Sequence, residues 1–380
     1  MAALERGGGE TFDLEISRHL KMLGCGVHYL VGAPLFAACP IPMHGADVSK
    51  LKSPYLPWFP WDKVRGGWRV RTAEFRAFER AAARWILREG AKFDIVQVCE
   101  LPYMVHRLKA AGFTKPIVIR LTAPNFYDPE GGVQEADAAI ASGTSIAKLR
   151  EGVRADCVDV PNAVDFEVFK PGASAWRISA GVSRDESVIL YVARFQAFKN
   201  HEVLLQSFAA LLKDISAARL VLVGSGPLRA RMESLCESLG MKPRVLFLGE
   251  VPFAALPDIY RAADVKVVSS DYESFCFAAI EAMSSGLPVV TTDCGWVPNL
   301  IGDRVTTGGS NGPDIAQRQG GLVVPTRDPV ALAAAMKRTL EDRQLANACG
   351  QWNRTRAVER HGWKSSAERL LDVYRKLVAA

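Results

Sequence analysis

The segment 265–292 constrains the fold of this chain more than any other. Two short apolar runs, 265–268 and 287–292, flank a helix-forming stretch that ends in Ser-Ser-Gly. A strand, a helix and a second strand in this order join two parallel strands through a helix that covers the sheet. The segment therefore predicts a parallel sheet with helices on its faces.

Two glutamates mark this segment as a candidate binding site. Glu273 stands where the first strand turns toward the helix, and Glu281 stands about two turns into the helix. Ligands of α/β sheets bind at the carboxyl ends of the strands, where helix N-termini also attract anions. Carboxylates at that edge suit the hydroxyl groups of a sugar or a ribose. The alternative is that Glu281 is solvated and Glu273 only caps the helix.

The same alternation of apolar runs and helical stretches fills the rest of the chain. Runs typical of strands occur at 27–31, 95–98, 117–121, 138–141, 158–160, 188–192, 220–223, 245–248 and 322–324. Helices are expected at 201–213, 228–239, 253–262, 329–342 and 365–378. A proline-bounded connection at 160–171 separates two sets of strands. We expect two Rossmann-like α/β domains, 1–165 and 166–364, followed by a C-terminal helix in 365–380.

Three glycines, Gly7 to Gly9, stand at the start of the first predicted helix. Glycine allows a ligand to approach closely, and a helix N-terminus attracts phosphate. Flexible N-terminal padding is an equally good interpretation. A doubly wound domain needs a strand before such a turn, yet only six residues precede Gly7. We therefore expect an incomplete first sheet, or a start site placed too late in the gene.

Length, charge and cysteine content argue against several classes of protein. The chain has 380 residues, 49% of them hydrophobic, which is enough for two domains with separate cores. The net charge of +6 is modest and favours anionic small molecules or a membrane surface over nucleic acid. The eight cysteines contain no C-x-x-C pair, and residues 1–10 contain no apolar run typical of a signal peptide. We expect a cytoplasmic protein with no metal site, no cofactor and no disulfide framework.

The segment 50–71 combines basic and aromatic side chains. Its charged residues are basic apart from Asp62, and one tyrosine, one phenylalanine and three tryptophans lie among them. This mixture suits a membrane interface or a lipid-linked or polyanionic acceptor. The alternative is a long loop whose aromatic side chains pack on its own domain. Peripheral contact with the inner face of a membrane is therefore a candidate property of this segment.

Two cations in the second half point to phosphate binding. Arg194 and Lys199 follow the predicted strand 188–192, at the edge of the sheet where ligands bind. Two cations at that edge can neutralise a diphosphate, and arginine can do so with two parallel hydrogen bonds. Two solvated loop cations are the alternative.

A glycine turn follows the next predicted strand. The run LVGSGP places Gly224 and Gly226 between a buried strand and a helix. Arg229 stands where the dinucleotide-binding fingerprint needs its third glycine. This departure argues against an enzyme that uses a nicotinamide cofactor.

Together these motifs resemble those of the retaining GT-B glycosyltransferases of family 4. The chain carries, in order, ARF followed by a lysine, LVGSGP, VLFLGEVPFAALPDIYRAADV, DYESF, EAMSSGLPVV and GLVVP. The resemblance is close from about residue 160 to the C-terminus and loose before it. It implies a GT-B fold, in which two Rossmann-like domains face each other across a cleft and the C-terminal helix returns to the N-terminal domain.

The resemblance also implies roles for individual residues. Arg194 and Lys199 would bind the donor diphosphate, Glu281 would bind the nucleotide ribose, and Glu273 would hold the hydroxyl groups of the donor sugar. The remaining candidates for donor binding are Gly8, Gly9, Gly224, Gly226, Ser274, Phe275, Cys276 and Phe277. Because negative charge develops on the leaving diphosphate, cations there would lower the barrier without a metal ion. Glu273, Arg194 and Lys199 are therefore also catalytic candidates.

The first half of the chain departs from the family pattern. Cys99 and Glu100 stand where the family usually has a histidine-bearing motif, and Arg120 stands where a second histidine is common. Glu100 is the catalytic candidate on this side. The departures favour a second hypothesis, a non-catalytic GT-B protein that binds a nucleotide or a protein partner. The joint presence of the two cations and two glutamates in the second half favours an enzyme.

We therefore expect a metal-independent, retaining glycosyltransferase of the hexosyltransferase type. Its donor would be a nucleoside-diphosphate sugar, used as a co-substrate. Its acceptor would be a glycan, a lipid-linked sugar or a small molecule. A nucleotide-sugar epimerase of the same architecture is a further alternative that no residue positively supports.

Overall fold

The computed structural model describes residues 8–34, 46–53, 67–122, 126–305 and 314–379. The chain forms two compact units, Met1–Asn162 with Trp363–Ala380, and Ala163–Gly362. We call them the N unit and the C unit. The chain passes from one unit to the other inside the proline-bounded connection 160–171 and again between Gly362 and Trp363.

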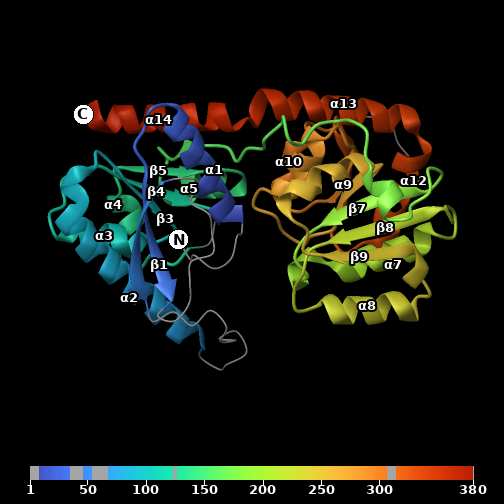
Figure 1. The fold of residues 1–380 in the computed structure, drawn as a ribbon, viewed down its shortest axis with the longest axis horizontal. Coiled ribbons are helices and arrows are strands. Elements are labelled where there is room, and N and C mark those ends of the chain that lie inside the picture. The colour runs from blue at the N-terminus through green and yellow to red at the C-terminus, as the bar shows by residue number, and fades with distance from the viewer. Residues whose placement is uncertain (1–7, 35–45, 54–66, 123–125, 306–313, 380) are drawn as a thin grey trace. The chain divides into compact units, whose positions relative to one another are not determined.

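The C unit is built on one seven-stranded sheet (Figure 1). Its strands are β7 (Ser187–Val192), β8 (Ala218–Val223), β9 (Val245–Gly249), β10 (Val265–Val268), β11 (Val289–Thr292), β12 (Ala316–Arg318) and β13 (Gly321–Val324). Their spatial order is β12-β13-β11-β10-β7-β8-β9, and every neighbouring pair is parallel except β12 with β13. Its helices are α6 (Trp176–Ser179), α7 (His201–Leu211), α8 (Arg229–Ser238), α9 (Leu256–Ala262), α10 (Phe277–Ser284), α11 (Val297–Leu300), α12 (Pro329–Glu341) and α13 (Arg343–Arg360).

Strands β10 and β11 are joined through α10, as the segment 265–292 predicts. Every residue of both strands is buried. One face of the sheet packs on a cluster that includes Ala279 and Met283 of α10, and the other packs on a cluster that includes Leu204 and Phe208 of α7. Strands covered on both faces are apolar throughout, which is why these runs could be recognised in the sequence. The predicted α/β class is confirmed.

The N unit contains two separate parallel sheets. Its elements are α1 (Gly8–Met22), β1 (His28–Pro34), β2 (Asp47–Ser53), α2 (Gly67–Glu89), β3 (Val96–Cys99), α3 (Pro102–Ala110), β4 (Ile117–Leu121), α4 (Gly132–Glu135), β5 (Ala138–Ala141), α5 (Thr144–Gly152), β6 (Val158–Asp159) and α14 (Trp363–Ala379). Strands β3, β4, β5 and β6 form one sheet in that order, while β1 and β2 pair only with each other. The described strands of this unit therefore do not form one continuous sheet.

The C-terminal helix α14 belongs to the N unit. The Trp363 ring lies 5.8 Å from the Phe12 ring of α1, measured between centroids. Further along α14, the Tyr374 hydroxyl donates a hydrogen bond of 2.6 Å to Gln97 Oε1 on β3. These contacts hold α14 against both α1 and the sheet.

Some elements of the structure were not predicted from the sequence. Strand β2 and the first residues of helix α2 fall within the basic and aromatic segment 50–71, for which a long loop was the alternative to a membrane contact. Residues 54–66 of that segment lie outside the described residues, and so do the residues before Gly8. Strand β12 and helix α13 were not predicted from the sequence either. The predicted membrane contact of 50–71 stays a prediction.

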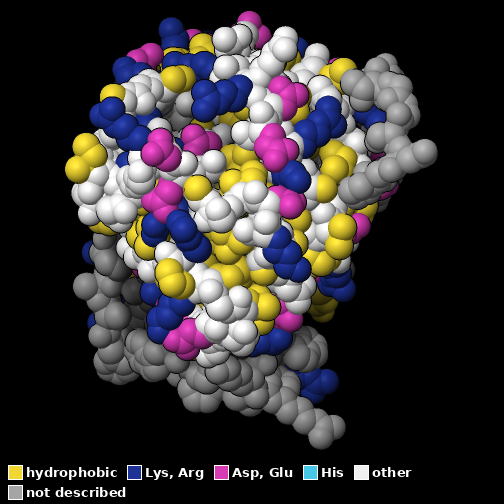
Figure 2. Space-filling model, turned by 90° about the vertical axis from the view of Figure 1, so that its right-hand side faces the viewer, with side chains coloured by type: hydrophobic (Ala, Val, Ile, Leu, Met, Phe, Trp, Pro, Cys, Tyr) yellow, Lys and Arg dark blue, Asp and Glu magenta, His cyan; other side chains and the backbone are white. Residues whose placement is uncertain are grey.

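Charged side chains of both signs are interspersed on the face drawn in Figure 2. Neither basic nor acidic side chains dominate any large area of that face, and apolar side chains lie between them. The basic side chains that give the chain its net charge of +6 therefore do not form a cluster on that face. None of the described helices combines the length and the apolar character needed to cross a membrane.

Candidate functional site

Lys199 and Glu273 meet at the carboxyl-end edge of the C-unit sheet. Lys199 ends the short turn Ala197–Lys199 after β7, and Glu273 lies between β10 and α10. Lys199 Nζ lies 2.6 Å from Glu273 Oε1, and Ser270 Oγ donates to the same oxygen at 2.7 Å. Glu273 is only 8% exposed, so the ion pair and the hydrogen bond hold its carboxylate in place. The two residues meet because β7 and β10 are neighbours in the sheet.

A second set of polar contacts fixes the turn that carries Lys199. Asn200 follows this turn in a left-handed backbone conformation, with φ of 56°. Its side-chain Nδ2 donates a hydrogen bond of 2.6 Å to Asp271 Oδ1. Arg327 binds both oxygens of Asp271, at 3.0 and 2.7 Å. Ser269 Oγ donates to the Lys199 carbonyl at 3.1 Å. Lys199 is thus preorganised by contacts with the segment that follows β10.

Gly224 and Gly226 are required by close backbone packing. Both have positive φ angles, 132° and 152°. A Cβ atom on Gly224 would lie 2.2 Å from the Ala193 carbonyl oxygen, and one on Gly226 would lie 2.7 Å from Phe195 N. The glycine turn therefore packs directly against the segment that carries Arg194. This packing role explains the two glycines without any ligand, and ligand contact by them stays a prediction.

Glu281 is half-buried and hydrogen-bonded rather than freely solvated. The Tyr260 hydroxyl donates to Glu281 Oε2 at 2.7 Å. Burial, together with the neighbouring Glu281 carboxylate, raises the Tyr260 pKa well above its usual value, so the hydroxyl keeps its proton. One oxygen of Glu281 is therefore held by a side chain of its own unit. Arg194 is exposed and lies directly after β7.

The turn between Glu273 and α10 contains a buried aromatic side chain and an unusual backbone angle. Phe275 is buried and packs against Phe277 and His361. Cys276 has a φ of 80°, an unusual angle for a residue with a side chain. Burial raises the pKa of its thiol to about 12, so the thiol stays neutral. Contact of a donor with the backbone of 274–277 stays a prediction.

The N-unit candidates gather at the carboxyl ends of β3 and β4. Glu100 follows β3 with a φ of 59°, and its Oε1 accepts a hydrogen bond from Thr122 N at 3.0 Å. Burial raises the Glu100 pKa, although Arg120 acts in the opposite direction. At the start of α1, the Gly9 carbonyl accepts a hydrogen bond of 3.2 Å from Arg120 Nη2. Gly8, the first residue of α1, precedes it.

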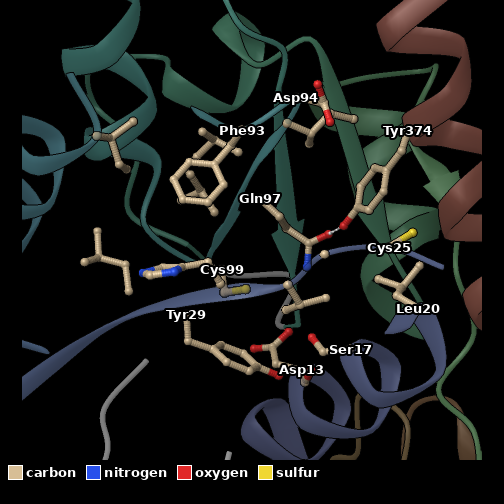
Figure 3. A pocket seen from close by; sticks show the side chains of 18 of the residues that line it. Asp13, Ser17, Leu20, Cys25, Tyr29, Phe93, Asp94, Gln97, Cys99 and Tyr374 are labelled. Carbon is tan, nitrogen blue, oxygen red and sulfur yellow. Dashed lines mark hydrogen bonds between the residues drawn. The ribbon is translucent and has the colours of Figure 1, made fainter. Parts of the chain in front are cut away.

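Asp13 is a polar residue of this region that the sequence reasoning missed. Its Oδ2 lies 2.8 Å from Arg120 Nη2, and both residues are only 5% exposed. Figure 3 shows Asp13 near Tyr29 and Cys99 on the wall of a cavity. A signal was present in the sequence, because Asp13 interrupts the apolar face of the first helix next to Phe12. A buried carboxylate at such a position needs a charged partner.

A family model matches the part of the chain that carries the C-unit site. Residues 174–356 match the family described as glycosyl transferases group 1. The matched segment includes Arg194, Lys199, Glu273 and Glu281. This part of the chain is similar to the glycosyl transferases group 1 family. The predicted family resemblance is thereby confirmed.

Curated glycosyltransferases match between about half and nearly all of the chain. A D-inositol 3-phosphate glycosyltransferase of Saccharomonospora viridis is 33% identical over 231 residues, which cover 58% of this chain and 50% of the relative. The chain spans about half the length of this relative and of others like it.

Solved structures show that the fold of this chain is GT-B. Sucrose-phosphate synthase from Thermosynechococcus elongatus has a TM-score of 0.78 and 24% identity, covering 98% of this chain and 94% of its own. HepE of Anabaena, solved in complex with UDP-glucose, has a TM-score of 0.73 and 18% identity, covering 98% and 97%. Identities this low show a shared fold only. The predicted GT-B fold is confirmed.

Proposed function

We propose that this chain is a glycosyltransferase that moves a sugar from a nucleoside-diphosphate sugar to an acceptor. The observation that carries the proposal is the Lys199–Glu273 pair at the sheet edge, inside the group 1 segment. A cation beside a fixed carboxylate suits the two parts of such a donor, its diphosphate and its sugar hydroxyls. Because HepE was solved with UDP-glucose, UDP-sugars are the first donors to test.

In this proposal, the C unit binds the donor. Arg194 and Lys199 neutralise the diphosphate, and Glu273 accepts hydrogen bonds from the sugar hydroxyls. Glu281 binds the ribose, and the hydroxyl of Tyr260 holds its carboxylate in one orientation. Backbone N–H groups at the start of α10 contribute further contacts.

The chemical step follows from where charge develops. As the bond to the anomeric carbon breaks, negative charge grows on the diphosphate, and Arg194 and Lys199 stabilise it more strongly than in the ground state. The reaction proceeds with retention and without a metal ion, and the diphosphate itself takes the acceptor proton. Glu100, with its raised pKa, is the candidate group on the acceptor side. Gly8 and Gly9, at the start of α1, contribute backbone groups to donor binding.

The acceptor is proposed as a glycan, a lipid-linked sugar or a small polyol. D-inositol 3-phosphate should be among the first acceptors tested, because several relatives are named D-inositol 3-phosphate glycosyltransferase. The basic and aromatic segment 50–71 would serve a lipid-linked acceptor at a membrane surface.

Calorimetric titration with nucleoside diphosphates and their sugar conjugates tests donor binding. We expect one nucleotide to bind with a Kd on the order of micromolar. Loss of a charge-assisted contact worth about 2–3 kcal/mol should weaken binding about 30- to 150-fold in Arg194→Ala and in Lys199→Ala. Lys213→Ala, which removes an exposed cation just after α7, is the matched control and should bind normally. Failure of every nucleotide to bind would contradict the proposal.

Turnover then separates an enzyme from a non-catalytic binding protein. Glu273→Gln keeps the shape of the side chain but loses the charge that pairs with Lys199. We expect its kcat to fall about a hundredfold while it still binds the nucleoside diphosphate, because Glu273 contacts the sugar. Nucleotide binding with no transfer and no donor hydrolysis would favour the non-catalytic alternative.

A further inference from the structure

The proposed function leaves one charged side chain in the core of the C unit without a role. Lys266 is the second residue of β10, and it has no exposed surface. Its Nζ has no hydrogen-bond partner among the described residues. Lysine is almost never fully buried unless it is paired, because an unpaired buried charge costs free energy. Such rules are broken most often at functional sites, so Lys266 is a candidate for a functional role.

The ammonium group of Lys266 lies close to the candidate donor site. Strand β10 leads directly into the turn that carries Glu273. The groups that act most strongly on the charge of Lys266 are Cys276, Glu281, Glu273 and Lys199. All four are residues that the sequence analysis singles out for donor binding. Lys266 therefore interacts with the donor-site residues from inside the core.

Tyr191 links Lys266 to the turn that carries Lys199. The Tyr191 ring centroid lies 5.1 Å from Lys266 Nζ, and the hydroxyl of the same ring donates to the Lys199 carbonyl. The His201 ring packs on the Tyr191 ring, with centroids 4.9 Å apart. Burial lowers the His201 pKa to about 3, so this imidazole carries no charge at neutral pH. Of these three core side chains, Lys266 is therefore the one that supplies positive charge.

A diphosphate needs more positive charge than Lys199 alone provides. Lys199 Nζ lies 2.6 Å from Glu273 Oε1, so this ion pair has no net charge. The Nζ of Lys266, in contrast, is hydrogen-bonded to no described carboxylate. A charge enclosed by protein is screened less than a charge at the surface, so the potential of Lys266 extends to the edge of the sheet.

We propose that Lys266 supplies part of the positive potential that binds the diphosphate of the donor. Lys266 acts at a distance through its charge and does not touch the ligand, so its role is electrostatic and not catalytic. The inference rests on the proposed function and deepens it by adding a residue to the donor site. It also gives a reason for a charge in the core, because functional residues often lower stability.

Calorimetric titration of the full chain with UDP, GDP and ADP tests this role. For the nucleotide that binds most tightly, we expect the Kd of Lys266→Met at pH 7 to be about tenfold higher than that of the unmodified chain. Lys213→Met is the matched control, because it removes the same charge from an exposed position just after α7. Its Kd should be unchanged. An unchanged Kd in Lys266→Met, or an equal increase in both variants, would overturn the inference.

The pH dependence of binding separates the charge of Lys266 from a structural effect of the substitution. Desolvation lowers the Lys266 pKa to about 8, so the ammonium group loses its proton between pH 7 and about 9.5. The Kd of the unmodified chain should therefore rise over this range, while that of Lys266→Met stays nearly constant. The rise is measured on the unmodified chain, so it decides the question even if Lys266→Met does not fold. A constant Kd in the unmodified chain would contradict the proposal.

The neighbours of Lys266 with shifted pKa values stay neutral over this pH range. Burial raises the pKa of Cys276 to about 12 and also raises that of Tyr191, so both keep their protons. His201 remains uncharged as the pH rises above neutrality. Helix α12, which also packs against β10, has no buried ionisable side chain among its described residues. A rise in Kd that persists in Lys266→Met would show that another group is responsible and would overturn the inference.

Proton uptake gives an independent measurement. A bound diphosphate favours the charged form of Lys266, and a tenfold effect on Kd corresponds to a rise of about one unit in its pKa. At about pH 8.5 the unmodified chain should then take up about half a proton on binding. Calorimetry in buffers of different ionisation enthalpy measures this uptake, which Lys266→Met should lack. Binding without proton uptake in the unmodified chain would overturn the inference.

These measurements distinguish failure of this inference from failure of the proposed function. Binding that is weakened in Lys199→Ala but not in Lys266→Met would overturn the role of Lys266 and leave the donor site in place. If no nucleotide binds to the unmodified chain, the donor site and the role of Lys266 are both wrong.

Discussion

Lys266 is a charged residue enclosed in the core of the C unit. It has no exposed surface, and its Nζ has no hydrogen-bond partner among the described residues. The Tyr191 ring centroid lies 5.1 Å from the ammonium group. Desolvation lowers the Lys266 pKa to about 8, although the neighbouring Cys276 and Glu281 act in the opposite direction. An ammonium group in this position destabilises the fold.

Replacing Lys266 with methionine should therefore stabilise the protein at pH 7, by about 1–3 kcal/mol. In the unmodified protein the pKa of Lys266 is lower in the folded state than its usual 10.5. Between about pH 8 and 10.5 the unfolded chain binds more protons, so the contribution of Lys266 to the free energy of unfolding rises with pH. Lys266→Met should lack this rise. Urea unfolding of both proteins at pH 7 and pH 10 measures the effect, and a less stable variant at pH 7 would show the interpretation to be wrong.

At the scale of single elements, the two glycines that flank α8 are required for different physical reasons, although both have a positive φ. Gly224, before the helix, has a φ of 132° and no room for a Cβ atom beside Ala193. Gly240, after the helix, has a φ of 69° and no heavy atom within 4 Å of an added Cβ. One position is limited by packing and conformation, and the other by conformation alone.

Gly224→Ala and Gly240→Ala are therefore a matched pair. Gly240→Ala should lower the free energy of unfolding by only about 1 kcal/mol. Gly224→Ala should lower it by about 2–4 kcal/mol, because the backbone at Ala193 must move. Since Arg194 follows Ala193, nucleotide binding should weaken only in Gly224→Ala. Denaturant unfolding measures the change in stability, and calorimetry measures nucleotide binding. Equal effects in the two variants would count against the packing explanation.

Helix α13 was missed in the sequence because little of it faces the core. Of its eighteen residues, the buried ones are Cys349, Gly350, Asn353 and Ala357, a set with only a weak apolar pattern. Strand β2 was missed for a similar reason, since its sequence DVSKLKS carries two lysines. Apolar periodicity identifies elements that bury one face or two, and it fails where burial depends on a few small or polar residues.

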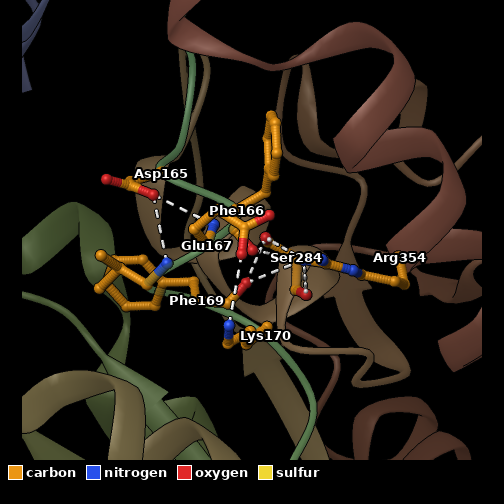
Figure 4. A network of polar contacts seen from close by, with 8 residues as sticks. Asp165, Phe166, Glu167, Phe169, Lys170, Ser284 and Arg354 are labelled. Atoms are coloured by element: carbon orange, nitrogen blue, oxygen red, sulfur yellow. Dashed lines mark hydrogen bonds and ion pairs between the residues drawn. The ribbon is translucent and has the colours of Figure 1, made fainter.

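At the scale of the whole molecule, the C unit is closed by contacts between its own two ends. Val164 N donates to the His361 carbonyl at 2.8 Å. Figure 4 shows Arg354 of α13 directed at the chain segment that enters the unit. Its Nη1 donates to the carbonyls of Phe166, Phe169 and Ser284 at 2.8, 3.1 and 2.9 Å. The entering segment is therefore tied to α10 and α13 within the unit.

This closure predicts that residues 163–362 fold on their own. The fragment keeps the whole seven-stranded sheet, both of its apolar clusters and the Lys199–Glu273 pair. We expect one cooperative urea transition and retained binding of the nucleoside diphosphate preferred by the full chain, because the proposed phosphate and ribose contacts all lie in it. A fragment that shows no cooperative transition would mean that the unit needs the rest of the chain for stability.

Local patterns in the sequence are enough to predict the α/β class, most strands of the C unit and the kinds of side chain at their carboxyl ends. These features depend on local periodicity and on motifs within a few residues of each other. Glu273 and Lys199 could be singled out in this way, but their contact depends on β7 lying next to β10. Strand order is decided by how whole elements pack, and no local pattern records it.

The Asp13–Arg120 pair and the unpaired edges of β1 and β3 could not be predicted in this way, because they depend on how distant elements pack. Asp13 and Arg120 are 107 residues apart in the chain, so their pairing follows from helix α1 packing beside β4. The edges of β1 and β3 are free because no described strand lies between them. Contacts between distant residues arise when apolar faces are buried together, and burial is a property of the assembled elements rather than of any one segment.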